Sequence, residues 1–135
     1  MNIFEFLTPK ANTFYLPSDS TIRQALEKFD TYKFSVVPLI DDNGAYISTL
    51  SVGDILRYIK NNCNFDLSMA ENNRVDKLEK YRPYIALPIS TPVEEIIKLS
   101  LEQNFVPIID DRGMFIGIIK RKTIIDTLFV NKINN

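Results

Sequence analysis

Three consecutive cations, Lys120, Arg121 and Lys122, lie between the apolar run 115–119 and the apolar pair 124–125. This pattern predicts a strand that passes directly into a helix, with the cations at the helix N-terminus. The helix dipole makes cations unfavourable there, at a cost of about 1 kcal/mol. One interpretation is a solvated surface turn. We favour the other, a phosphate clamp in which helix N–H groups and cations share one anion, with Arg121 as its main ligand.

A hydroxyl and a carboxylate occupy the matching point in the first half of the chain. Ser51 and Asp54 stand three residues apart in "SVGD", where a second helix is expected to begin. Ser51 suits the N-cap, and the charge of Asp54 suits the first helical turn. A capped helix N-terminus still offers N–H groups to an anion, so the capping and ligand-binding interpretations are compatible.

Several kinds of chemistry are disfavoured by composition. The chain has no histidine and a single cysteine, Cys63, so Ser-His-Asp and Cys-His nucleophile systems are excluded within it. Zinc would have to use one cysteine and carboxylates, which is a poor ligand set. No phosphate-binding loop of the P-loop type is present. We therefore expect neither an enzyme nor a metal site.

The charge balance and the termini point to a binding protein in a reducing compartment. The net charge of −1 gives no bulk attraction for nucleic acid or an anionic membrane. One cysteine allows no intrachain disulfide. The N-terminus lacks a signal-peptide pattern, and no apolar run reaches transmembrane length. These features predict a cytoplasmic protein without nucleic-acid or membrane partners.

The chain repeats itself. The segments "VVPLIDDNGAYI" (36–47) and "FVPIIDDRGMFI" (105–116) are identical at seven of twelve positions. Each is preceded by an extended piece (13–16 or 84–87) and a helical pattern, and each is followed by another helical pattern. The order is β-α-β-β-α, twice, in an α/β (α+β) fold. Expected boundaries are 1–60 for the first repeat with its lead-in, 61–74 for the connection and 75–135 for the second repeat.

Helix and turn signals complete the outline. Ser20 is the expected N-cap of the first helix, and Thr91 to Glu94 form a capping box with Pro92 at the first helical position. The paired aspartates 41–42 and 110–111 precede glycine in both hairpins, which favours a turn over a metal or catalytic role. Cys63 is interpreted as incidental to the connection.

The repeated "VPLIDDNG" turn and the strand-to-helix junction resemble the cystathionine-β-synthase (CBS) domain. The closest likeness is to small stand-alone CBS-pair proteins (Bateman modules) of Gram-positive bacteria, with "FLTPK" as a short lead-in helix. The resemblance implies two repeats packed as a pseudo-twofold pair and, often, a homodimer. It further implies an adenine-nucleotide ligand between the repeats: AMP, ADP, ATP, S-adenosylmethionine or cyclic di-AMP.

The resemblance also assigns site residues through its motif Gly-h-h-Thr/Ser-x-x-Asp. The first repeat keeps Ser51 for phosphate and Asp54 for ribose, whereas the second keeps Gly117 but has Lys120 and Thr123 in place of the hydroxyl and the aspartate. One implied cleft combines Phe14, Tyr15, Ser35 and Val36 with Lys120, Arg121 and Lys122. The other combines Ile85, Ala86, Asn104 and Phe105 with Ser51 and Asp54.

Two functions from different classes follow. The first is a regulatory module that senses an adenine nucleotide, without a further cofactor, and signals to an unknown regulated protein. The alternative, supported by the altered second motif, is a ligand-free structural, dimerisation or protein-interaction module.

Overall fold

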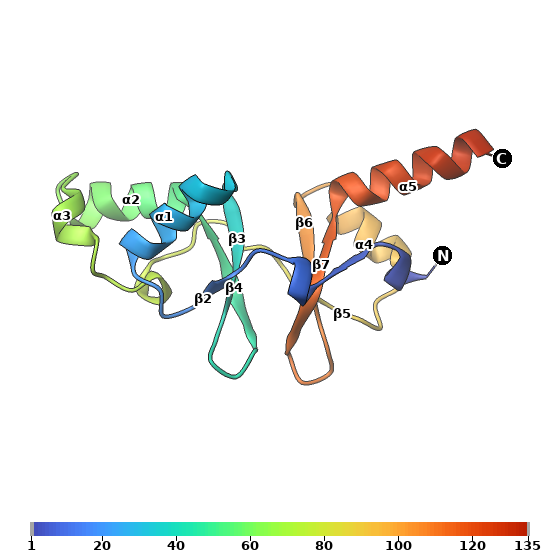
Figure 1. Cartoon of the computed structure of the whole chain (residues 1–135), viewed down its shortest axis with the longest axis horizontal. Coiled ribbons are helices and arrows are strands. Elements are labelled where there is room, and N and C mark those ends of the chain that lie inside the picture. Colours follow the sequence, from blue (N-terminus) through green and yellow to red (C-terminus); the bar gives the residue numbers. More distant parts are fainter. Residues whose placement is uncertain (1, 135) are drawn as a thin grey trace. The chain divides into compact units, whose positions relative to one another are not determined.

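The computed structural model describes residues 2–134, which form two compact units (Figure 1). The first-repeat unit spans residues 14–83. The second-repeat unit combines the chain up to Thr13 with the chain from Tyr84 onward. The outer limits of the expected repeats, residues 1 and 135, lie outside the described residues. Within the described part, none of the helices combines the length and apolar character needed to cross a membrane.

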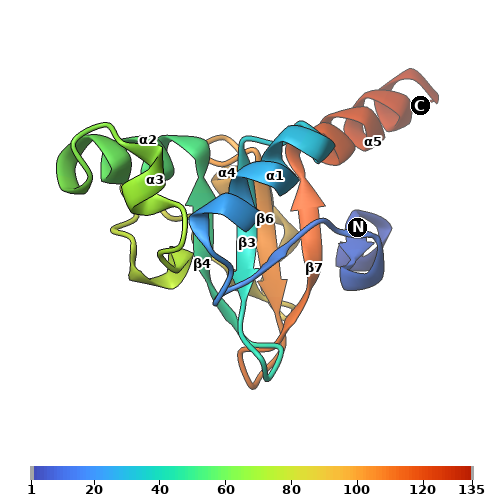
Figure 2. The same cartoon turned by 60° about the vertical axis from the view of Figure 1, so that its left-hand side comes forward.

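The first-repeat unit contains the predicted β-α-β-β-α order. Its main elements are β2 (Leu16–Pro17), α1 (Ile22–Tyr32), β3 (Val36–Ile40), β4 (Tyr46–Ser51) and α2 (Val52–Asn62). The sheet order is β2-β3-β4, with β2 parallel to β3 and β3 antiparallel to β4. Helices α1 and α2 lie beside this sheet in both views (Figures 1 and 2). The expected elements are thus confirmed in their order, but β2 is shorter than the extended piece predicted at 13–16 and shares only Leu16 with it.

The core of this unit is formed by side chains that recur at the helical period along α1 and at every second residue along β3. Ile22, Ala25 and Phe29 come from one face of α1, and Val37 and Leu39 alternate along β3. The sequence placed the α1 cap one residue too early. Thr21 is the N-cap and forms a capping box with Gln24, whereas the buried Ser20 hydroxyl donates to the Pro17 carbonyl oxygen.

The segment expected as a polar connection belongs to the same core. It contains α3 (Leu67–Ala70), followed by a 3-10 turn, η3 (Val75–Lys77). Cys63 and Ala70 are 3% and 0% exposed and pack with the core side chains of α1 and α2. Cys63 is therefore a core residue and not an incidental loop residue, because the chain after α2 folds back over the unit.

The second-repeat unit contains the same elements plus an additional strand. They are β1 (Leu7–Pro9), β5 (Leu87–Pro88), α4 (Val93–Leu99), β6 (Phe105–Ile109), β7 (Phe115–Lys120) and α5 (Arg121–Asn134), with short 3-10 turns η1 (Ile3–Glu5) and η2 (Lys10–Asn12) flanking β1. The sheet order is β1-β7-β6-β5. The expected capping box of α4 is absent: Pro92 is the N-cap, and no side chain caps the helix.

The lead-in segment is a strand of the second-repeat unit and not a helix before the first repeat. Strand β1 pairs antiparallel with β7, with Leu7 opposite Ile119 and Pro9 opposite Gly117. A Cβ atom on Gly117 would lie 2.2 Å from the Thr8 carbonyl oxygen. Gly117, expected as part of a nucleotide motif, thus has a packing role: it lets β1 approach β7. The first repeat has Ser48 at the corresponding position.

Candidate functional site

Ser51 is the N-cap of α2, as the sequence predicts, and the Asp54 side chain completes a reciprocal cap with it. The Asp54 N–H donates to Ser51 Oγ at 3.0 Å, and the Ser51 N–H donates to Asp54 Oδ2 at 3.0 Å. Strand β4 delivers Ser51 directly to the start of α2, and Ser51 pairs across the sheet with Val36. The Val52 N–H donates to the Ser35 carbonyl oxygen at 3.0 Å. Four of the expected site residues therefore meet around the N-terminus of α2.

The Asp54 carboxylate has two further donors on its other oxygen. Arg57 Nη2 donates to Oδ1 at 2.7 Å, and the Tyr81 N–H donates to the same oxygen at 3.0 Å. Asp54 is only 4% exposed. Burial raises the pKa of Asp54, but the N–H groups of Tyr81 and Ser51, the Arg57 guanidinium and the Ser51 hydroxyl outweigh burial and lower it below its ordinary value. The carboxylate is thus held ionised and is heavily hydrogen-bonded.

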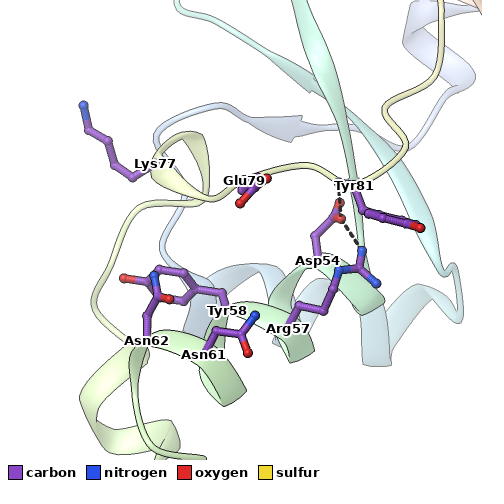
Figure 3. A pocket seen from close by; sticks show the side chains of 8 residues that line it. All are labelled: Asp54, Arg57, Tyr58, Asn61, Asn62, Lys77, Glu79 and Tyr81. Carbon is purple, nitrogen blue, oxygen red and sulfur yellow. Dashed lines mark hydrogen bonds and ion pairs between the residues drawn. The ribbon is translucent and has the colours of Figure 1, made fainter.

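A pocket of about 360 Å³ opens beside this carboxylate, between α2 and the chain segment that follows η3 (Figure 3). The Arg57 guanidinium lies 4.7 Å from the centre of the Tyr81 ring, which closes one end of the pocket. The lining residues are Asp54, Arg57, Tyr58, Asn61, Asn62, Lys77, Glu79 and Tyr81. Of these, sequence reasoning named only Asp54. The helical spacing of the polar residues from Asp54 to Asn62 was the available signal.

An aromatic stack lies before β3 in the same unit. The Phe14 ring is 4.6 Å from the Tyr32 ring and 5.5 Å from the Phe34 ring, and both pairs are stacked. Phe34 is 47% exposed, and the neighbouring Tyr15 is half-buried. Phe14 was expected at the site. Phe34 was not, although it directly precedes the expected Ser35.

The cationic triplet divides into one anchored and two exposed side chains. Arg121 Nε donates to the Ser100 carbonyl oxygen at 2.6 Å, and the Arg121 N–H donates to the Asn104 carbonyl oxygen at 2.9 Å. Ser100 follows the last residue of α4, where the helix dipole is negative. Lys120 and Lys122 are exposed. Arg121 is unfavourable at the N-terminus of α5, which it begins, but its side chain contacts the C-terminal end of α4.

Gln103 organises the remaining expected residues of the second-repeat unit. Its side-chain amide accepts from the Ile85 N–H at 2.7 Å and donates to the carbonyl oxygens of Ile85 and Phe105 at 3.1 and 3.2 Å. Ala86 is half-buried, and Asn104 is exposed. The Phe105 ring is only 9% exposed and lies edge-on to Tyr84 at 4.8 Å. Phe105 is therefore a core side chain, and sequence reasoning missed Gln103.

The paired aspartates build turns. Asp41 Oδ1 accepts from the Asn43 and Ala45 N–H groups, both at 2.9 Å. Asp110 Oδ1 accepts from Arg112 and Met114 at 2.8 and 2.9 Å. No cluster of three or more metal-ligand side chains occurs among the residues that the structure describes.

The family assignment comes from two matches along the sequence. The sequence model of the CBS domain matches residues 5–61 and again residues 79–130. The chain belongs to the CBS domain family. Two CBS domains in tandem confirm the resemblance drawn from the repeated turns, and they account for the repeated β-α-β-β-α order.

Two CBS-pair relatives are informative. CBSX2, a chloroplastic CBS domain-containing protein of Arabidopsis thaliana, is 26% identical over 144 residues, which cover 90% of this chain but only 60% of that protein. A crystal structure of CBSX2 in complex with AMP has a TM-score of 0.75 at 26% identity and covers 97% of this chain and 98% of the other. CbpB of Listeria monocytogenes, solved with cyclic di-AMP, shares the fold: its TM-score is 0.82 at 18% identity, and the match covers 98% of each chain.

Proposed function

We propose that this CBS pair is a regulatory module that binds an adenine nucleotide and passes the bound state to a partner protein. The observation that carries the proposal is the AMP complex of CBSX2, which is 26% identical over nearly the whole of both chains. A ligand changes signalling only by binding one conformation better than another, so the module must have two states.

The first-repeat unit supplies groups suited to the ligand. The exposed Phe34 ring, stacked on Phe14, suits an adenine base, since base–aromatic stacking contributes about 1–3 kcal/mol. Ser51 and the N-terminus of α2 suit a phosphate, and Asp54 suits ribose hydroxyls. In the second-repeat unit, the exposed Lys120 and Lys122 suit an anionic group. Tyr15, Ile85, Ala86 and Asn104 remain proposed cleft residues.

Calorimetry on protein freed of co-purified nucleotide tests this function. AMP, ADP, ATP, S-adenosylmethionine and cyclic di-AMP are titrated separately, and at least one should bind. That ligand should also raise the melting temperature, because a hundredfold excess over Kd stabilises the folded state by about 2.7 kcal/mol. Absence of binding by all five would refute the proposal. Mass spectrometry of the purified protein identifies any retained nucleotide.

A ligand-independent interaction module is the second candidate, and one observation favours it. Ile125 and Phe129 lie four residues apart on α5 and are 57% and 61% exposed. Exposed apolar side chains grouped on helices are typical of interfaces. A homodimer is part of both proposals. Light scattering of the wild type and of Phe129→Ser distinguishes a dimer that depends on α5 from a monomer.

We place the protein in the cytoplasm and assign it no reaction. The single thiol, Cys63, is buried, which suits a protein that needs no disulfide. Incubation of each bound nucleotide with the protein, followed by chromatography, tests the second point: a product that forms only with protein would identify an enzyme.

A further inference from the structure

Asp54 has two roles that compete with each other. The proposed function, on which this inference rests, uses its carboxylate as an acceptor for ribose hydroxyls. In the structure the same carboxylate holds the chain segment after η3 through the Tyr81 N–H. A carboxylate offers about four acceptor positions. Three N–H groups already occupy positions on Asp54, which leaves about one position free.

A ribose diol cannot be added to this arrangement without a loss. Two hydroxyl groups need two acceptor positions, and Asp54 is only 4% exposed. One of its present donors must therefore leave when a diol binds. A buried carboxylate cannot accept a further hydrogen bond while its present donors fill the positions that the new donor needs.

Of the three N–H donors, Tyr81 is the least constrained by its surroundings. The Ser51 N–H belongs to the capping box of α2, and Arg57 lies one turn along the same helix at 2.7 Å with an opposite charge. The Tyr81 N–H, by contrast, comes from a segment outside helix and strand, 27 residues away in sequence. Its ring is largely exposed and is held by the Arg57 guanidinium (Figure 3).

We propose that Tyr81 is a latch: nucleotide binding at Asp54 displaces the Tyr81 N–H and frees one of the two segments that join the units. The chain passes from one unit to the other after Thr13 and again after Pro83, and the second of these points is two residues beyond the latch. Nucleotide binding at Asp54 thereby makes the connecting chain segment more mobile. The ion pair of Asp54 with Arg57 stays in place, so the carboxylate remains compensated when the latch opens.

A pair of variants at residue 81 tests the latch. Tyr81→Pro removes both the ring and the N–H, whereas Tyr81→Ala removes the ring and keeps the N–H. Calorimetry uses AMP and cyclic di-AMP. Tyr81→Pro should bind the nucleotide about tenfold more tightly than Tyr81→Ala, because the competing donor is gone, although it should melt at a lower temperature. Equal or weaker binding by a folded Tyr81→Pro would overturn the latch.

Amide exchange in the wild type gives an independent measurement, and it decides the matter if Tyr81→Pro does not fold. Saturation with nucleotide should accelerate exchange of the Tyr81 amide at least tenfold and leave the Ser51 amide protected. Unchanged protection of Tyr81 in the saturated protein would overturn the latch but not the proposed function. If neither nucleotide nor any of the other three binds the wild type, both fail together.

Discussion

Arg121 Nε donates to the carbonyl oxygen of Ser100 at 2.6 Å and so links the start of α5 to the end of α4. The second contact of the guanidinium, from Nη2 to the Leu101 carbonyl oxygen, is longer at 3.5 Å. Cations stabilise the C-terminal end of a helix and satisfy its free carbonyls. The charge of Arg121 is thus unfavourable for α5, where its backbone lies, but favourable for α4, where its guanidinium lies.

Arg121→Ala should therefore destabilise the protein. A hydrogen bond from a charged group contributes about 1.5–3 kcal/mol, which exceeds the roughly 1 kcal/mol gained by removing a cation from the start of α5. We expect a net loss of about 0.5–2 kcal/mol in urea unfolding. Lys122→Ala is the matched control: it removes a cation from the same helical turn without a bond to α4, so it should leave stability unchanged or slightly raised. If the Arg121 variant were as stable as the control, the contact with Ser100 would have no structural role.

The contribution of Asp54 to stability should depend on pH. The pKa of Asp54 is lower in the folded protein than its ordinary value of 3.8. A carboxyl with a lowered folded pKa contributes stability that is present above its unfolded pKa and is lost as pH falls through the folded pKa. Asp54→Asn should thus lower the free energy of unfolding most at pH 7 and progressively less below about pH 4. A difference that is the same at pH 7 and pH 3 would contradict this.

Gly117→Ala should disrupt β1. The new Cβ would meet the backbone of Thr8, which cannot move without breaking the pairing of β1 with β7. We expect a loss of about 2 kcal/mol or more, within the range of overpacked sites, and faster amide exchange in β1. Gly113→Ala is the control: its φ is +80°, but no atom lies within 4 Å, so it carries only the backbone strain of about 1 kcal/mol. If the two variants lost the same free energy of unfolding, contact between the new Cβ and Thr8 would not explain the effect of Gly117→Ala.

Phe34→Ala should affect ligand binding more than folding. Its ring is 47% exposed, so its removal should cost less than about 1 kcal/mol of stability. If the ring stacks on adenine, AMP affinity should fall about tenfold, measured by calorimetry. Phe65→Ala, at a residue that is 74% exposed in the same unit, is the control and should bind AMP as the wild type does. A normal affinity in the Phe34 variant would place the base elsewhere.

The sequence predicted what depends on short spacings. The Ser51–Asp54 box joins residues three apart, and the hairpins of Asp41 and Asp110 are closed by N–H groups two and four residues on. Local geometry fixes such contacts whatever the rest of the fold does.

Contacts between segments far apart in the sequence could not be predicted in this way. Tyr81 donates to Asp54 through its main-chain N–H, a group that every residue except proline carries. The identity of residue 81 therefore does not indicate this contact. The side chain of Gln103 binds Ile85 across 18 residues, and no periodicity marks that pairing. The direction of Arg121 also depended on where α4 ends, which the sequence alone does not place relative to α5.

The pairing of β1 with β7 has a consequence for the time course of folding. Leu7 and its partner Ile119 are far apart in the sequence, so Leu7 is synthesised long before Ile119. Contacts between residues so far apart form late, because closing a long loop is entropically costly. Until β1 arrives, β7 has an unpaired edge, and such an edge can recruit a strand of another chain. The edge of β7 is therefore most exposed to misassembly in the interval before β1 pairs with it.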